Sequence, residues 1–337
     1  MPPSDSTKAN QTPVRAAWHL DVKAAIPLDG QFSLAASVIA PADLNPGQPV
    51  TVLACLPGGF LSRHYFDLEI QGSRTYSFAA AMAALGYVVL SFDHVGTGDS
   101  PKPSPTDEGY ALGVEVIAAA NQLALDAALD RLTNGSADDD LPPIEVDRTI
   151  GVGHSMGSML TVEQQALAHP HDALALFSFS TQGTPRFIDD EMRAYANDPH
   201  RLRSEIGALA KATMGSPYPE RATDSESNRR AAFGVGTAGD EAEDALHQAA
   251  TNLLAVGGLM SMVPGGFAPP AQKIDVPVFM LVGDHDLHDD RHTRDELPNA
   301  PSVTTSILPD CWHCHFVANT RETLVREVHA FIQLLGD

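Results

Sequence analysis

The chain has only three cysteines among its 337 residues. An odd, small number of cysteines in a chain of this length does not form a disulfide framework, so we expect the fold to depend on a hydrophobic core. Long apolar runs are missing as well. The N-terminal stretch MPPSDSTKANQTPVRAAW has no leader-like apolar segment, and no run approaches the roughly 18 residues of a membrane span. We therefore expect a cytoplasmic protein without a membrane span; a secreted protein whose signal peptide has been removed would have the same features.

Basic residues are also scarce. The chain has 21 lysines and arginines against 43 aspartates and glutamates, which gives a formal net charge of -22. A surface with this excess of negative charge repels the phosphate backbone of nucleic acids and anionic lipid headgroups. We therefore expect no nucleic-acid partner and interpret the acidity as an aid to solubility. Nothing in the sequence predicts an oligomeric state.

The chain is rich in aliphatic residues: 43% of it is hydrophobic, and only 6% is aromatic. Short apolar runs alternate with amphipathic stretches along most of its length. The apolar runs predict strands at 18–26, 32–39, 49–57, 87–93, 149–155, 173–180, 276–284 and 302–310, and the amphipathic stretches predict helices at 77–86, 111–132, 156–169 and 319–336. This alternation predicts an α/β fold with a doubly wound, mostly parallel sheet and helices on both faces.

The alternation breaks once, in the second half of the chain. The broken segment has no clear strand, is rich in alanine and charged residues, and contains glycine–proline breaks such as MGSPYPE and VPGGFAPP. It is too long for a plain loop between two strands. We therefore expect a disordered tail at 1–14, an α/β core at 15–182 and 273–337, and an inserted helical cap at 183–272.

Residues 153–157 read Gly-His-Ser-Met-Gly, the pattern G-x-S-x-G. The pattern is common and weak by itself, but here an apolar strand precedes it and a helix follows, as a nucleophile elbow requires. Gly153 and Gly157 flank the serine because the tight turn brings other backbone very near. The helix N-terminus points free N–H groups at developing negative charge. An ordinary turn with a capping serine is the alternative; the context favours Ser155 as a nucleophile.

Four segments, in order, resemble the α/β-hydrolases over nearly the whole chain except the cap and the tail. They are LPGGF (56–60), FDHVGTGDSPKP (92–103), GHSMG (153–157), and the pair VGDHD (282–286) with PDCWH (309–313). RHYFD (63–67) is similar to a Tyr-aromatic-Asp segment of esterase- and lipase-like members. Pro57 departs from the family, which commonly has histidine there. The resemblance implies the α/β-hydrolase fold with a Ser–acid–His order.

The resemblance also implies roles for single residues. The family's Gly-x-x-Asp spacing, counted from Gly283, selects Asp286 as the acid and leaves Asp284 as a turn residue. No carboxylate follows the strand at 173–180, where the family has its alternative acid. His313 falls just after the last strand, where the family has its base, and His315 is expected to point elsewhere on the loop.

The implied catalytic residues are Ser155, Asp286 and His313, with the amides of Met156 and Gly59 as the oxyanion hole and that of Phe60 as the fallback. Gly58 and Gly59 read alternatively as no more than a turn.

Two groups of residues permit other interpretations. His285, His288, His292, His313, His315, Cys311 and Cys314 could together ligate zinc, but no H-E-x-x-H or paired C-x-x-C framework is present. Cys311 and Cys314 form one C-x-x-C without a thioredoxin-like context, so we expect structural thiols. His94 and Asp99 read as parts of a glycine-dictated turn. We expect no metal and no cofactor.

The sequence therefore predicts a serine hydrolase that cleaves carboxylic esters or lactones through an acyl-enzyme. The cap stretch LLAVGGLMSMVPGGFAPP (253–270) is apolar and carries methionines, which suits an adaptable pocket for a small hydrophobic substrate. The core of the cap itself is an equal alternative for this stretch. The alternatives on the same scaffold are a thioesterase, an amidase, a C–C hydrolase or a cofactor-free perhydrolase. A non-catalytic ligand-binding protein of this fold is the alternative from another class.

Overall fold

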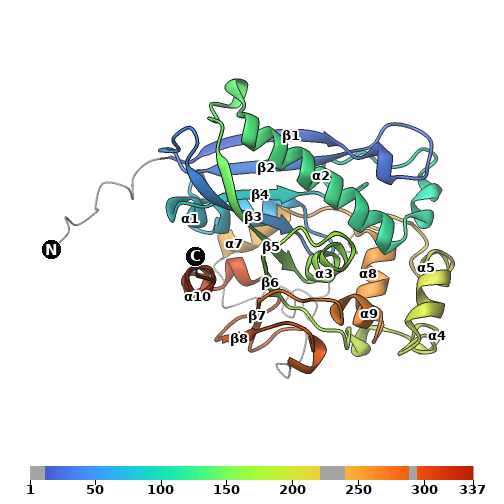
Figure 1. The fold of residues 1–337 in the computed structure, drawn as a ribbon. Helices are drawn as coiled ribbons and strands as arrows, with labels where there is room; N and C mark the ends of the chain where they lie inside the picture. The colour runs from blue at the N-terminus through green and yellow to red at the C-terminus, as the bar shows by residue number, and fades with distance from the viewer. Residues whose placement is uncertain (1–11, 221–239, 288–293, 337) are drawn as a thin grey trace.

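The computed structural model describes residues 12–220, 240–287 and 294–336. One sheet of eight strands lies at the centre of these residues, with helices on both faces (Figure 1). Its order is β1-β2-β4-β3-β5-β6-β7-β8; the β1–β2 and β2–β4 pairs are antiparallel and all later pairs are parallel. The strands are β1 (Val14–Asp21), β2 (Ser33–Ala40), β3 (Pro49–Leu56), β4 (Val88–Phe92), β5 (Glu145–His154), β6 (Ala173–Phe177), β7 (Val278–Gly283) and β8 (Val303–Leu308). The predicted α/β fold is confirmed.

Successive residues of β3 enter two different cores, because neighbouring side chains of a strand point to opposite faces. Val52 and Ala54 lie in a core that includes residues of α2 and α3, whereas Leu53 and Cys55 lie in a core that includes residues of α1 and α10. The four helices are α1 (Phe78–Ala84), α2 (Val114–Asn134), α3 (Met156–Ala168) and α10 (Arg321–Leu334). A strand covered on both faces must be apolar throughout, which explains the continuous apolar runs. Within the described ranges, every helix is too short or too polar to cross a bilayer.

The first strand begins and ends earlier than the sequence suggested. It begins at Val14, inside the range expected to be disordered, and it pairs with β2 from Val14–Ala40 to Asp21–Ser33. Residues 1–11 lie outside the described ranges. Beyond Asp21 the chain turns into a short 3-10 helix, because the Asp21 carboxylate accepts the Lys23 amide at 2.8 Å.

The insertion between β6 and β7 is helical and has no strand in the part that the structure describes. Its helices are α4 (Asp190–Arg193), α5 (Pro199–Met214), α7 (Asp240–Gln248), α8 (Ala255–Met262) and α9 (Ala268–Ala271). Helices α8 and α9 pack on α3, and α5 packs on α8 (Figure 1). Since α3 directly follows Ser155, this packing brings the insertion next to the candidate nucleophile. Its role as a cap stays a prediction.

Candidate active site

Ser155 lies at the sharp junction between β5 and α3. Its backbone has φ 53° and ψ -124°, a region that non-glycine residues rarely adopt. The Ser155 amide donates to the carbonyl oxygen of Phe177 at 2.8 Å, and the Ser158 hydroxyl donates to the same oxygen at 2.8 Å. These two hydrogen bonds tie the junction to the end of β6 and hold the strained residue in place.

Two glycines allow the backbone around Ser155 to approach its neighbours. A Cβ atom at Gly153 would lie 2.4 Å from the Cα atom of Ser158, and a Cβ atom at Gly157 would lie 2.0 Å from the carbonyl oxygen of Leu56. Both distances are far below van der Waals contact, and both neighbours are backbone atoms. The flanking glycines of the G-x-S-x-G pattern are therefore required by close packing, as the sequence predicted.

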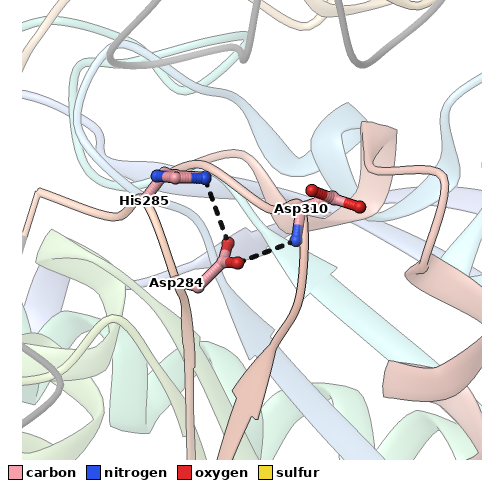
Figure 2. Close-up of side chains that lie close together, drawn as sticks. All are labelled: Asp284, His285 and Asp310. Atoms are coloured by element: carbon pink, nitrogen blue, oxygen red, sulfur yellow. Dashed lines mark hydrogen bonds and ion pairs between the residues drawn. The ribbon is translucent and has the colours of Figure 1, made fainter.

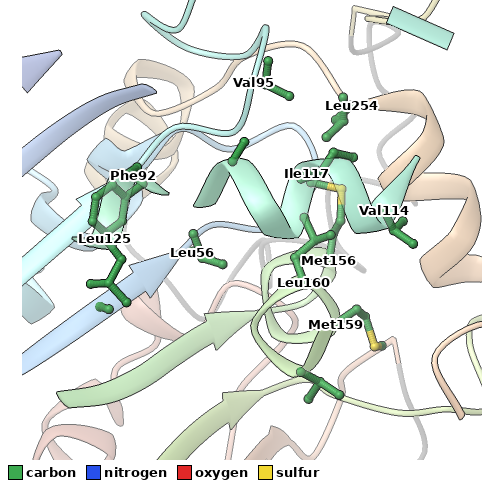
Figure 3. Packing of buried hydrophobic residues seen from close by; sticks show 14 of the residues in the cluster. Leu56, Phe92, Val95, Val114, Ile117, Leu125, Met156, Met159, Leu160 and Leu254 are labelled. Atoms are coloured by element: carbon green, nitrogen blue, oxygen red, sulfur yellow. The ribbon is translucent and has the colours of Figure 1, made fainter. Parts of the chain in front are cut away.

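Buried apolar side chains pack the first turns of α3 against the rest of the core. Met156, Met159 and Leu160 are buried, and Figure 3 shows them packed among Ile117 of α2, Leu56 at the end of β3 and neighbouring aliphatic residues. Burial of one such side chain stabilises the fold by roughly 1.5–3 kcal/mol. The start of α3, and with it Ser155, is thus anchored in the larger of the two cores.

The structure brings together the three side chains that the sequence singled out as a triad. Nε2 of His313 lies 2.9 Å from Oγ of Ser155, and Nδ1 of His313 lies 2.7 Å from Oδ1 of Asp286. His313 is 8% exposed and Asp286 is 9% exposed. A carboxylate can only accept, so Nδ1 carries the imidazole proton and Nε2 is free to accept the proton of the Ser155 hydroxyl.

Asp286 is held as an anion in this buried position. Burial by itself raises the pKa of its carboxyl, but the charge interaction and hydrogen bond with His313, together with the hydrogen bond from His315, lower the pKa well below its usual value. The amide of Leu287 adds a hydrogen bond at 2.6 Å to Oδ1. The position after β6, where the sequence has no carboxylate, is taken by Ser178, whose hydroxyl donates to Oδ2 of Asp286.

His315 does not point away from this site, so that expectation is wrong. Its Nε2 lies 3.0 Å from Oδ2 of Asp286, on the other oxygen of the carboxylate that His313 contacts. A short 3-10 helix begins at His315, so the chain is not extended there, and residues two positions apart need not point in different directions. His315 makes no hydrogen bond to Ser155 among the described residues. Only His313 therefore bridges Ser155 and Asp286.

Two further histidines brace the loops around Ser155. His94 was expected only as part of a glycine-dictated turn, and no motif pointed to His154. Nε2 of His154 donates to the carbonyl oxygen of His313 at 2.8 Å, and Nε2 of His94 donates to that of Pro57 at 2.9 Å. Burial first, and then the neighbouring His313 and His315, lower the pKa of His154 well below its usual value. His154 occupies a variable position of the G-x-S-x-G pattern, where the pattern specifies no side chain.

The loop after β3, which carries Gly58 and Gly59, lies beside Ser155. A Cβ atom at Gly58 would lie 3.1 Å from the Cβ atom of Ser155. Among the described residues, the amides of Met156, Gly59 and Phe60 donate no hydrogen bond to another part of the chain. Met156 is the first residue of α3, so its free N–H also lies at the positive end of the helix dipole.

Asp284 stabilises the loop between β8 and His313. Its two carboxylate oxygens accept the amides of Asp310 and Cys311, each at 3.0 Å, and so hold the loop that carries His313. Figure 2 shows the contact with Asp310. Asp284 lies in a turn, as predicted, but the amides that it accepts belong to the distant loop after β8. In the part of the chain that the structure describes, Asp284, His285 and Asp310 are the one group of three side chains close enough to share a cation. All three are exposed, and His285 stacks on Trp312 with ring centroids 4.4 Å apart.

The remaining candidates of the sequence fall outside the site or take structural positions. His288 and His292 lie outside the described ranges. Cys311 and Cys314 are buried free thiols, and burial raises the pKa of Cys311 strongly, which leaves the thiol protonated and unreactive. Asp99 binds Nη2 of Arg63 at 2.7 Å and belongs to the glycine-rich turn after β4.

The fold and this geometry agree with a match to known proteins. A model of the alpha/beta hydrolase family matches residues 53–327, and the chain belongs to that family. No curated protein matches the chain.

Solved structures of several different enzymes share this architecture. An esterase from Rhodococcus sp. ECU1013 is 19% identical over 97% of this chain and 100% of its own, with a TM-score of 0.53. A proline iminopeptidase from Mycobacterium smegmatis is 16% identical over 95% of this chain and 100% of its own, with a TM-score of 0.57. A bromoperoxidase from Bacillus anthracis is 15% identical over 94% of this chain and 100% of its own, with a TM-score of 0.54. These likenesses support the fold and do not select one of the three activities.

Proposed function

We propose that the protein is a serine hydrolase that cleaves carboxylic esters or lactones through an acyl-enzyme on Ser155. One observation carries the proposal: Ser155, His313 and Asp286 form a continuous chain of hydrogen bonds of 2.9 and 2.7 Å at a nucleophile elbow. A serine hydroxyl is a weak nucleophile until a base takes its proton, and an imidazole is an effective base only when its other nitrogen is fixed. This chain of hydrogen bonds meets both requirements.

In the proposed reaction, His313 accepts the Ser155 proton at Nε2 while Oγ attacks the carbonyl carbon of the substrate. The amides of Met156 and Gly59 bind the oxyanion that forms, and one such donor is typically worth about 10²–10³ in rate. His313 then protonates the leaving alcohol. Water, activated in turn by His313, hydrolyses the acyl-enzyme and releases the acid. Asp286 stays ionised and stabilises the imidazolium in both steps.

We also propose that the insertion at 183–272 acts as a cap over this centre and shapes the substrate pocket. A Cβ atom at Gly59 would lie 2.6 Å from Cδ1 of Leu253, and one at Gly257 would lie 3.1 Å from Sδ of Met156. Apolar residues of the insertion therefore contact both segments of the proposed oxyanion hole. This supports a small hydrophobic substrate, whose acyl or alcohol part would lie against Leu253 and its neighbours.

The proposal is tested with a substrate panel. Wild-type protein and the variant Ser155→Ala are assayed on matched p-nitrophenyl esters, lactones, thioesters and anilides of increasing acyl length. We expect turnover of esters or lactones by the wild-type protein and a loss of about 10³-fold or more in Ser155→Ala. A preference for thioesters or anilides would support the corresponding alternative chemistry. Equal turnover by both proteins would contradict the proposed nucleophile.

A further inference from the structure

Asp286 holds its carboxylate between two sets of donors, one on each oxygen. Oδ1 accepts from Nδ1 of His313 at 2.7 Å and from the amide of Leu287 at 2.6 Å. Oδ2 accepts from Nε2 of His315 at 3.0 Å, from the amide of Gly283 at 3.3 Å and from the hydroxyl of Ser178. A carboxylate bound through one oxygen alone could turn about its side-chain torsion. The contacts on Oδ2 remove that freedom.

His315 is suited to be a permanent donor in this arrangement. Its side chain is fully buried, and its ring lies against those of His154 and Phe177, at centroid distances of 5.5 and 6.2 Å. Its Nε2 must carry a proton, because the ionised carboxylate of Asp286 only accepts. Its Nδ1 is buried without a hydrogen-bond partner among the described residues. A proton on Nδ1 would be an unsatisfied buried donor, so the geometry favours the tautomer that donates to Asp286 through Nε2.

We propose that His315 is a positioning residue of the site: it holds Oδ2 of Asp286, so that Oδ1 stays aligned with His313, and it withdraws negative charge from the carboxylate. This inference rests on the proposed function, because it assigns His315 a role in the same serine-hydrolase centre. Misplacement of a catalytic group by about 1 Å can cost about 10²-fold in rate. A donor on Oδ2 therefore affects catalysis without touching the substrate or Ser155.

The withdrawal of charge by His315 predicts the direction in which the pH profile should shift when His315 is replaced. Without the His315 donor, the carboxylate of Asp286 carries more negative charge toward His313 and stabilises the imidazolium form more strongly. The acid limb of the activity profile, which reports protonation of the base, then moves to higher pH. The other titratable groups facing this carboxylate and His315 are His154 at the end of β5, Tyr65 of the 3-10 helix Arg63–Asp67, and Cys311, Cys314 and Asp284 around the base loop.

The experiment measures the rate at which a fluorophosphonate reagent labels Ser155, as a function of pH, so that no natural substrate is needed. His315→Leu removes the donor, and His315→Gln keeps an amide N–H with a similar reach. His285→Leu is the matched control, since that histidine is exposed and stacks on Trp312. We expect His315→Leu to label about 10–100-fold more slowly, with its acid limb at higher pH. His315→Gln should recover most of the rate, and His285→Leu should match the wild type.

Equal rates and equal acid limbs in His315→Leu and the wild type would overturn the inference. Equal defects in His315→Leu and His315→Gln would also overturn it, since they would indicate packing alone. Imidazole ¹⁵N–¹H spectra of the wild-type protein provide a test that needs no variant. They should show the proton of His315 on Nε2 and that of His313 on Nδ1, and a proton on Nδ1 of His315 would contradict the inference. Absence of labelling at Ser155 in the wild type would contradict the proposed function, while the spectra would still decide the role of His315.

Discussion

Gly157 lies directly against the carbonyl group of Leu56: a Cβ atom at Gly157 would be 2.0 Å from the Leu56 oxygen. The two residues belong to α3 and β3, whose side chains meet in one buried core. Neither element can move away without opening that core. The geometry of Ser155 therefore depends on the missing side chain of a neighbouring glycine.

The elbow glycines provide the first prediction. Gly157→Ala and Gly153→Ala should each lower the free energy of unfolding by about 2 kcal/mol or more, because a methyl group must displace backbone atoms. Gly113→Ala is the control, since a Cβ atom there would meet only the flexible Glu115 side chain, at 3.3 Å. Urea denaturation measures all three. Similar stability of Gly157→Ala and Gly113→Ala would show that the elbow tolerates a side chain.

The two loops beside Ser155 provide the second prediction, which compares two histidines. His313→Ala should reduce kcat/KM on the best ester by about 10³-fold or more, because Ser155 loses its base. His285→Ala should stay near the wild-type value, because His285 lies at the exposed edge and contacts Trp312 instead. Circular dichroism establishes that both variants are folded. A larger loss in His285→Ala than in His313→Ala would refute the assignment of the base.

A third prediction concerns the stability of the fold at acidic pH, to which His171, a buried histidine outside the candidate site, contributes. Burial lowers the pKa of His171 to about 3. An unfolded histidine titrates near about 6.5, so below that pH the unfolded chain binds a proton that the folded chain does not. The contribution of His171 to stability should therefore fall as pH falls, by about 2 kcal/mol between about pH 7 and pH 5. Unfolding of His171→Leu should lack this part of the pH dependence, whereas parallel curves for the two proteins would contradict it.

The attachment of the insertion to the core provides a fourth prediction. Nη2 of Arg203 on α5 binds Oε2 of Glu163 on α3 at 2.7 Å, with side chains 17% and 10% exposed. Arg203→Met leaves the Glu163 charge buried without this partner and should cost about 3–5 kcal/mol. Lys211→Met is the control: Lys211 also reaches the core from α5, through Asp107, but both side chains are mostly exposed. Arg203→Met should melt at a lower temperature than Lys211→Met in thermal unfolding. Equal melting temperatures would contradict a stabilising role of the buried Arg203–Glu163 ion pair.

Much of the fold could be predicted from the chain because each strand covered on both faces is a continuous apolar run. The pattern failed at β1, where Val14 pairs with Ala40 in a segment that looked too polar to be ordered. β1 lies at the edge of the sheet, and its pairing along β2 supplies hydrogen bonds that hydrophobic periodicity does not register. Local side-chain bonds, such as that of Asp21 to the Lys23 amide, then ended the strand early.

Local sequence alone predicted the candidate site only where close backbone packing requires a particular residue type. The glycines around Ser155 are such a case, whereas Asp286 and His313 were implied by the resemblance to the α/β-hydrolases. The contacts of His315 and Ser178 with Asp286 were not predictable, because they depend on where β6 ends relative to the base loop. Two residues far apart in sequence meet there through tertiary structure. No local pattern encodes that meeting.

The central claim is that Ser155 carries the acyl group during turnover. The most direct measurement is peptide mass spectrometry after an acid quench of the reaction with p-nitrophenyl acetate, made on the wild type and on Ser155→Ala. We predict an acetyl group on the peptide that contains Ser155 in the wild type and none in the variant, with release of p-nitrophenol lost in parallel. An acyl group on another residue, or continued turnover by Ser155→Ala, would contradict this account.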